Sequence, residues 1–287
     1  MSPGPITGLV LVDKPAGPSS FGVLRSLRPA LGAKLGHAGT LDPFATGLLL
    51  VLAGRATRLA AYLSGLDKRY QAVVQFGAVS PTLDPEGEIE PTGEETGEDA
   101  VRAAAAAMVG EIRQAVPAFS AVKVDGRRAY ARMRAGEAVA PEPRAVTIHG
   151  LDVDAFDAAT QRARISVRCS KGTYVRQIAA DLGTATGAGA YCLELRRTGV
   201  GEFDVAEAGT PEEIAARPAG PWFRPPAAAL PHLPARELSP VEAGAAGRGR
   251  ALDLRDEAGP VRLLAGGELV AVGEPRAGRL RPVVVLS

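Results

Sequence analysis

A glycine-punctuated loop near the N-terminus carries the most reactive combination of side chains in the sequence. Residues 36–47 read GHAGTLDPFATG, which places His37 and Asp42 in one short segment with three glycines. Pro43 disfavours helical geometry at Asp42, and glycines allow tight turns, so we expect this carboxylate in a stiff loop. An ionised carboxylate held in this way can act as a covalent nucleophile. An isolated Asp-Pro pair more often caps a turn, so the loop indicates a site without identifying its reaction.

Four further stretches follow the same order along the chain as the motifs of one known family. They read LVDKPAGPSS (11–20), DKRY (67–70), SKGTYVRQIAADLG (170–183) and LRRTGVGEF (195–203). Together with HAGTLDPFATG (37–47), they resemble the motifs of the TruB family of tRNA pseudouridine synthases. The resemblance extends over residues 9–203, and the order and spacing of five motifs argue against chance agreement.

The resemblance implies a reaction that needs no cofactor. The bond from the sugar to the base nitrogen of a uridine breaks, the base turns over, and a new bond forms at carbon 5. The implied substrate is uridine 55 in the T loop of tRNA, which must be flipped out of the folded loop. Asp42 would be the nucleophile, and its attack on the sugar and its attack on the base ring both stay open. Arg176 would pair with Asp42 and keep that carboxylate charged.

The remaining site residues are also implied by the resemblance. Tyr70 would stack on the flipped base and help to move the proton on carbon 5. Tyr174 would lie against the base, and Leu195 would form an apolar wall. His37 would fill the place that the base leaves, and Lys14 would complete the substrate site. Taken singly, these residues are more often strand aromatics or core side chains, so the inference depends on the whole set.

A basic segment in the middle of the chain resembles the family's RNA-clamping insertion, at about residues 117–148. Residues 119–134 read FSAVKVDGRRAYARMR and contain the cations that would grip phosphates: Lys123, Arg127, Arg128, Arg132 and Arg134. A solvated amphipathic helix is the alternative interpretation. Two departures from the family pattern, Val116 and Pro81, affect loop rigidity and RNA contacts rather than the chemistry.

The periodicity of the chain predicts an α+β catalytic domain over residues 1–232. Apolar runs at 9–12 and 48–53 and alternation at 70–76 and 165–169 indicate strands. Ser19 and Ser20 precede Phe21, Leu24, Leu27 and Leu31 at helical spacing, and a second helix is expected at 98–109. Without regular βαβ alternation, a mixed, largely antiparallel central sheet flanked by helices is favoured. The resemblance implies the pseudouridine synthase fold.

The sequence pattern of the C-terminal part predicts a separate small domain. The Pro-rich stretch 218–234 predicts a linker that carries no sheet hydrogen bonds. Short strand-like pieces at 261–264, 269–272 and 283–286 are separated by glycines, as in a small β-barrel. Residues 236–287 resemble a PUA-like RNA-binding barrel that opens with a helix at 238–250. A barrel with a purely structural role is the alternative.

Composition and charge indicate a soluble globular protein with a moderately basic body. The chain of 287 residues is 46% hydrophobic and 23% charged, which is ordinary for globular proteins. Eight acids crowd residues 84–99, so the rest of the chain carries a formal charge of +9 instead of +1. Apolar runs are shorter than the roughly 20 residues that cross a bilayer, and the start lacks a signal-peptide pattern. We therefore expect a cytoplasmic protein without a membrane segment. The family resemblance implies a monomer that binds the T-arm stem-loop of tRNA without an obligate protein partner.

The cysteines and histidines indicate no metal site. Cys169 and Cys192 are too far apart for a CxxC motif and are expected to be buried, and His37, His149 and His232 lie in unrelated contexts.

Two other functions are weighed against the enzyme. A catalytically silent module that binds or folds tRNA is disfavoured because the motif residues are intact. A nucleosidase-type hydrolase would use Asp42 but normally needs a second carboxylate as general acid.

Overall fold

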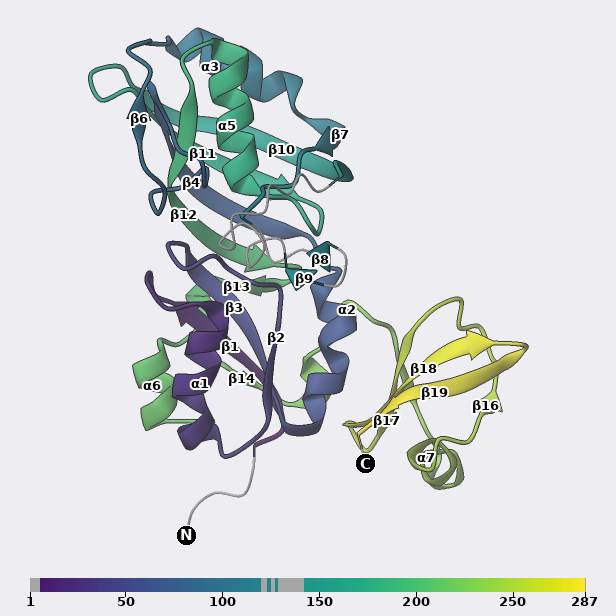
Figure 1. Ribbon diagram of the computed structural model, residues 1–287. Coiled ribbons are helices and arrows are strands. Elements are labelled where there is room, and N and C mark those ends of the chain that lie inside the picture. The colour runs from purple at the N-terminus through teal and green to yellow at the C-terminus, as the bar shows by residue number, and fades with distance from the viewer. Residues whose placement is uncertain (1–5, 120–122, 125–126, 129–141, 287) are drawn as a thin grey trace. The chain divides into compact units, whose positions relative to one another are not determined.

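The computed structural model describes residues 6–119, 123–124, 127–128 and 142–286. Contacts divide the chain into two compact units (Figure 1). Unit 1 combines Met1–Asp42, Gly47–Gly65 and Gly201–Ser287, and unit 2 combines Pro43–Thr46 with Leu66–Val200. Unit 1 is therefore assembled from both ends of the chain, whereas unit 2 is almost continuous.

The sheet of unit 1 is built around two buried strands. Its order is β14 (Phe223–Arg224), β1 (Gly8–Lys14), β3 (Thr46–Ala53) and β2 (Leu35–Ala38), with antiparallel pairing throughout this set. Leu9 to Val12 and Leu48 to Ala53 are fully buried. A strand covered on both faces reads as a continuous apolar run, which is why both strands were predictable.

Helix α1 (Ser20–Leu31) covers this sheet with the predicted periodicity. Ser19 is its N-cap and accepts a hydrogen bond from the Gly22 N–H, and Gly32 ends the helix in a left-handed conformation. Leu24 and Leu27 are buried, but Phe21 is 63% exposed. The prediction that Phe21 belongs to the apolar face is wrong, because in the first turn it lies away from that face. Helix α6 (Pro211–Ala216) packs against α1, and the short helix α2 (Ala60–Ser64) follows β3.

Unit 2 contains an antiparallel sheet with helices on it. Its order is β12 (Ala190–Val200), β4 (Lys68–Phe76), β11 (Arg162–Cys169), β10 (Arg144–Asp157) and β7 (Gly110–Gln114). Helix α5 (Val175–Thr186) packs on β12, and α3 (Glu98–Ala107) packs on β10 and α5. The alternating burial along β4 and β11 matches the predicted strands. The helix predicted at 98–109 is confirmed, although it ends at Ala107.

Two short hairpins complete unit 2. One pairs β5 (Ala78–Val79) with β6 (Glu90–Pro91), and the other pairs β8 (Lys123–Val124) with β9 (Arg127–Arg128). The second hairpin lies in the basic segment, so the alternative of an amphipathic helix is wrong for these four residues. Arg132 and Arg134 lie outside the described residues.

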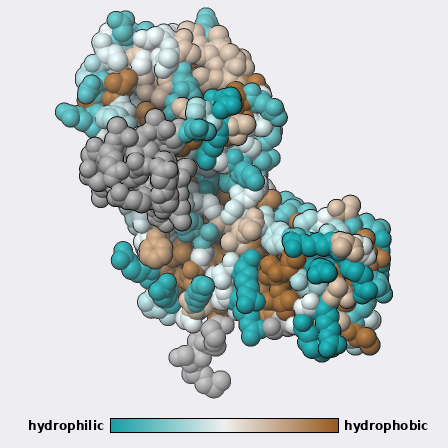
Figure 2. All heavy atoms as spheres, turned by 45° about the vertical axis from the view of Figure 1, so that its right-hand side comes forward, coloured by the Kyte–Doolittle hydropathy of each residue, from teal (hydrophilic) through white to brown (hydrophobic). Residues whose placement is uncertain are grey.

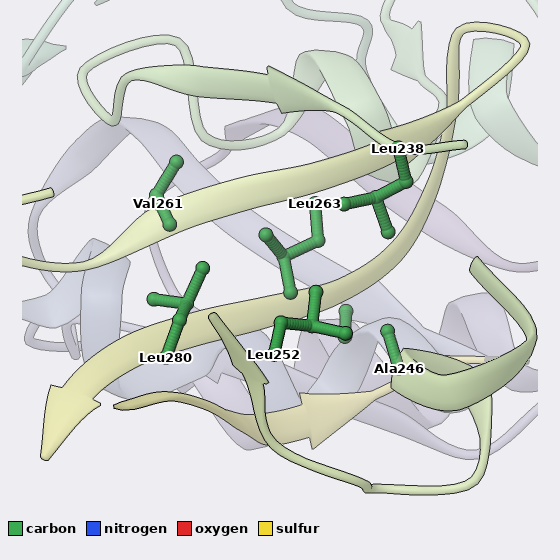
Figure 3. Close-up of a cluster of buried hydrophobic side chains, with 7 residues drawn as sticks. Leu238, Ala246, Leu252, Val261, Leu263 and Leu280 are labelled. Atoms are coloured by element: carbon green, nitrogen blue, oxygen red, sulfur yellow. The ribbon is translucent and has the colours of Figure 1, made fainter. Parts of the chain in front are cut away.

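The C-terminal part forms its own sheet and core. The order is β15 (Ala235–Glu237), β17 (Val261–Ala265), β18 (Glu268–Arg276), β19 (Arg279–Val285) and β16 (Leu252–Asp253). Helix α7 (Pro240–Gly247) lies beside it. Figure 3 shows the side chains between them, which include Leu238, Ala246, Leu252, Val261, Leu263 and Leu280. The three predicted strands and the opening helix are confirmed, while the likeness to a PUA barrel stays a prediction.

The Pro-rich stretch is not a bare linker. Phe223 and Arg224 form strand β14, which pairs with Val10 and Leu9 of β1. The Leu11 N–H donates to the Trp222 carbonyl at 3.0 Å, and the Trp222 side chain is buried. The prediction that this stretch lacks sheet hydrogen bonds is wrong, because prolines are tolerated beside an edge strand. The domain limits 1–232 and 236–287 stay a prediction.

Candidate active site

The loop that carries Asp42 connects the paired strands β2 and β3. His37 lies opposite Val51 in this pairing, and Asp42, which is half-buried, follows in the loop. Buried Ser20 fixes the loop from the start of α1. Its hydroxyl donates to the Leu41 carbonyl at 2.9 Å and accepts from the Leu41 N–H at 2.8 Å. Both main-chain polar groups of the residue before Asp42 therefore have a partner.

Lys14 lies at the other end of this loop. It is the last residue of β1, pairs in register with Gly47, and is fully buried. Its ammonium group donates to the Pro15 carbonyl at 2.8 Å. His37, which is half-buried, and Lys14 thus belong with Asp42 to unit 1.

The other predicted site residues lie in unit 2. Tyr70 is on β4 and Leu195 is on β12, where Leu195 pairs with Ala72 and Arg197 pairs with Tyr70. Tyr70, Leu195 and Arg197 are all buried, so they share the covered face of these neighbouring strands. An apolar wall next to a tyrosine ring is the kind of surface on which a planar base can stack.

Arg176 lies in the first turn of α5 and forms a buried ion pair with Asp84. One guanidinium nitrogen is 3.0 Å from Asp84 Oδ2, and the two side chains are 3% and 4% exposed. The guanidinium also donates to the Thr82 carbonyl at 2.6 Å and to the Phe119 carbonyl at 3.1 Å. The Thr82 hydroxyl donates to Asp84 Oδ1 at 2.6 Å. These contacts fix the guanidinium in one place.

Sequence reasoning missed the role of Asp84. Its position in an acidic stretch indicated a surface residue, whereas the structure buries it beside Arg176. The available signal was local sequence context. Asp84 stands two residues after Thr82 and behind Pro81, whereas the exposed acids come further along the chain. Asp42 belongs to unit 1 and Arg176 to unit 2, and their pairing stays a prediction.

A buried lysine precedes Tyr70 by two residues on the same strand. Burial, and secondarily the charge of Arg197, lowers the pKa of Lys68 to about 8. Burial also raises the pKa of the neighbouring Cys169 thiol to about 11, so this thiol is unreactive at neutral pH. Cys169 and Cys192 are both buried, as predicted, and neither forms a disulfide within the described residues.

Of the predicted RNA-binding cations, Lys123, Arg127 and Arg128 lie in the hairpin of β8 and β9. The side chains of Lys123, Arg127 and Arg128 are not described, so their RNA contacts stay predictions.

Within the described residues, no three His, Cys, Asp or Glu side chains gather as a metal site would need. Across the same ranges, no helix is long and apolar enough to span a membrane. Figure 2 shows hydrophilic and hydrophobic residues interspersed over the face that it presents.

Comparisons with known proteins identify the family and the fold of the chain. The sequence pattern of the TruB family pseudouridylate synthases (N terminal domain) matches residues 27–175. A structure of an H/ACA RNP bound to a substrate RNA containing 2'-deoxyuridine has a TM-score of 0.75 at 22% identity, and covers 98% of this chain and 85% of that one. A Cbf5-Nop10-Gar1 complex gives 0.74 at 24% identity, with 98% and 84% covered. At such identities the likeness concerns the fold. Together, the fold and family matches define a pseudouridine synthase, which is an isomerase.

Curated relatives narrow the class further. Proteins named tRNA pseudouridine synthase B are 42% identical in Azoarcus sp. (strain BH72), over 96% of this chain and 94% of the relative, and 42% identical in Thermobifida fusca, over 98% of both. A third, from Thiobacillus denitrificans, is 43% identical over 96% and 95%. The chain belongs to the TruB family.

Proposed function

We propose that this protein converts uridine 55 in the T loop of tRNA to pseudouridine, as a cytoplasmic monomer without a cofactor or an obligate protein partner. The observation that carries this proposal is the near-full-length identity of 42–43% with proteins named tRNA pseudouridine synthase B. The intact motif residues favour an active enzyme over a silent tRNA-binding module. The family match favours isomerisation over hydrolysis.

Asp42 is the proposed nucleophile. Its attack leads to cleavage of the bond between the sugar and N1 of the base, and the base then rotates while it stays in the pocket. A bond from the sugar to carbon 5 forms and the bond to Asp42 breaks. Carbon 5 loses its proton and N1 gains one, so the product is an isomer of the substrate and the carboxylate is regenerated. The hydrogen bonds from Ser20 to Leu41 support this role, because they restrict the loop that aims the carboxylate.

Arg176 is proposed to keep Asp42 ionised and oriented. Two features support this role: the guanidinium is almost fully buried, and three acceptors already fix its orientation. A buried cation of fixed geometry interacts strongly with a second carboxylate, because little water screens the charges. Asp84 would compensate part of the Arg176 charge before and after the reaction.

The flipped base is proposed to bind against tyrosine and leucine side chains. Tyr70 would stack on the base and assist proton transfer at carbon 5, Leu195 would form the apolar wall, and Tyr174 would contact the base from the start of α5. The shared face of Tyr70 and Leu195 supports this arrangement. His37 would occupy the space that the base leaves, and Lys14 would support the substrate site. Stacking on these rings would offset the few kcal/mol lost when the base unstacks.

Mapping of modified nucleotides tests the proposal directly. The protein is incubated with an unmodified tRNA transcript, and pseudouridine is located at nucleotide resolution. Pseudouridine at position 55 alone is expected, and a transcript with U55 replaced by C is the matched control. Formation elsewhere, or none at all, contradicts the proposal.

A pre-folded T-arm stem-loop in excess chelator separates RNA folding from catalysis, and metal-reversible loss of activity there contradicts metal independence.

A further inference from the structure

Tyr174 is held in place by a residue that belongs to no recognised motif. Gln114 is the last residue of β7 and is 1% exposed. Its side-chain amide donates to the Tyr174 carbonyl at 3.0 Å, and its carbonyl oxygen accepts from the Tyr174 N–H at 2.8 Å. The amide therefore pairs with both polar main-chain groups of Tyr174, as a neighbouring strand would. This fixes the backbone of Tyr174 where α5 begins.

A second residue holds the ring of the same tyrosine. The guanidinium carbon of Arg144, the first residue of β10, lies 4.5 Å from the centre of the Tyr174 ring. The same guanidinium donates to the Gly172 carbonyl. Gly172 has a φ of +85°, and a Cβ there would come within 3.3 Å of the Arg144 guanidinium carbon. A glycine thus leaves room for the cation to lie over the ring.

The two holding residues are a single cross-strand pair. Arg144 lies directly opposite Gln114 in the antiparallel register of β10 and β7. A shift of β10 by one residue in this register would turn Arg144 to the other face of the sheet, away from Gln114. One pair of facing residues therefore sets both the backbone and the ring plane of Tyr174.

We propose that Gln114 and Arg144 are positioning residues for pseudouridine formation and act through Tyr174. The inference rests on the proposed contact of Tyr174 with the flipped base. Arg144 covers one face of the ring, which leaves the other face for the uridine. A misplacement of about 1 Å can cost on the order of a hundredfold in rate, so the Gln114 and Arg144 contacts affect the chemical step more than RNA binding.

Two substitutions test the proposal, and a neighbouring arginine supplies the control. Arg144→Met removes the charge and the planar group while keeping an unbranched side chain, and Gln114→Glu replaces the donor to the Tyr174 carbonyl. Arg113→Met is the matched control, because Arg113 also donates to a main-chain carbonyl, that of Pro143, but is exposed. We expect single-turnover rates at least about tenfold lower for the first two, tRNA Kd changed less than about threefold, and a control like wild type.

A double-mutant cycle shows whether the effect passes through Tyr174. In a Tyr174→Leu background, Arg144→Met is expected to cause little further loss, because the ring that it orients is absent. The same fractional loss in both backgrounds overturns the proposal, as does a wild-type rate for Arg144→Met. Equal thermal midpoints for the Arg113 and Arg144 variants exclude a folding defect.

A measurement without RNA separates this proposal from the function on which it rests. Ring resonances of Tyr174 in the free protein are expected to shift in Arg144→Met and to stay unchanged in Arg113→Met. Unchanged resonances in both variants overturn the positioning role, whatever the RNA assays give. The two proposals can also fail separately. If the wild-type protein forms no pseudouridine but the Tyr174 resonances shift in Arg144→Met, the proposed function is contradicted and the positioning of the ring is supported.

Discussion

Asp84 differs from the neighbouring acids because its carboxylate is buried and paired with a cation. Seven other acids follow it between Glu86 and Asp99, and all of them are exposed. Asp84 alone among the described acids of this stretch is buried, where it pairs with Arg176. A buried ion pair need not stabilise a fold more than apolar residues would, but breaking it leaves one uncompensated charge.

Asp84→Asn is therefore expected to affect both stability and catalysis. The free energy of unfolding should fall by about 3–5 kcal/mol, because Arg176 loses its carboxylate inside the protein. Turnover should fall at least about tenfold, because the guanidinium is no longer fixed. Chemical denaturation and single-turnover assays measure the two effects. Glu88→Gln, an exposed acid of the same stretch, is the control, and equal behaviour of the two variants would contradict this role.

Asp42→Asn tests the nucleophile itself. The amide keeps the shape of the side chain but cannot form the covalent intermediate, so turnover should be lost while the Kd for tRNA stays nearly unchanged. Single-turnover assays and a binding titration measure both quantities. Asp99→Asn, in the first turn of α3, controls for the loss of one charge. A rate within about tenfold of wild type would show that Asp42 is not the nucleophile.

At the scale of secondary-structure elements, helix α7 depends on a charged cap. Ser239 and Glu242 form a reciprocal capping box, and Glu242 also pairs with buried Arg236 at 2.6 Å. The hydrogen bond from the Ser239 N–H, followed by that from Arg236, lowers the pKa of Glu242 to about 2. The ordinary value is 4.5.

This shift predicts how Glu242→Gln changes stability with pH. Because the folded-state pKa lies below the ordinary one, the charge of Glu242 stabilises the fold above about pH 4.5. That contribution is lost as the pH falls from about 4.5 to about 2. The variant should therefore unfold at a lower temperature than wild type at pH 7, and the difference should shrink towards pH 2. Exposed Glu268→Gln is the control, and a pH-independent difference contradicts the assignment.

The hairpin of β8 and β9 carries the cations predicted to grip phosphates. Replacing Arg127 and Arg128 by Ala should weaken tRNA binding and flatten its salt dependence. The log-log slope should fall by roughly 0.7 to 0.9 for each phosphate that is no longer neutralised, while the rate of the bound complex survives. Binding titrations at several salt concentrations measure this. Replacing exposed Arg162 and Arg164 controls for the loss of two charges, and an unchanged slope would remove the basic hairpin from the RNA interface.

Local periodicity predicted the elements, but it could not predict contacts between distant segments. The alternation from Tyr70 to Phe76 gave strand β4, because one face of that strand is buried. Phe21 fitted helical spacing but is exposed, because the buried face of α1 passes through Ser20, Leu24 and Leu27 and Phe21 lies beside that face. Gln114 shows no local signal, since its function depends on a pairing with Tyr174 across 60 residues. The Asp42 loop was recognisable because all its residues are close in sequence.

At the scale of the whole molecule, the C-terminal sheet contacts the rest of unit 1 through polar groups. The Tyr62 hydroxyl donates to Glu274 at 2.8 Å, and Arg55 donates to the Leu286 carbonyl at 3.0 Å. Every residue with a proposed catalytic role lies before Gly201. These hydrogen bonds therefore attach the C-terminal sheet, which contains no residue with a proposed catalytic role.

A chain that ends at Pro234 is expected to bind tRNA less well without losing its chemistry. It keeps β14 and with it the edge of the first sheet. The Michaelis constant for tRNA should rise because the C-terminal sheet no longer binds phosphates and sugars, while the maximal rate changes little. A T-arm stem-loop should show a smaller loss than whole tRNA. Steady-state kinetics of both proteins on both RNAs measure this, and a folded truncation with a hundredfold lower maximal rate would contradict it.

The pairing of β1 with β14 also fixes an order of events during synthesis. β1 leaves the ribosome before unit 2, whereas Phe223 and Arg224 follow only after all of unit 2. Because Leu66–Val200 is continuous, unit 2 can complete its sheet while the last strands of unit 1 are still being made. Until then the edge of β1 lacks its β14 partner at Leu9 and Val10, and such an edge is a template for pairing with other chains. Translation that stops before Phe223 therefore leaves an aggregation-prone product.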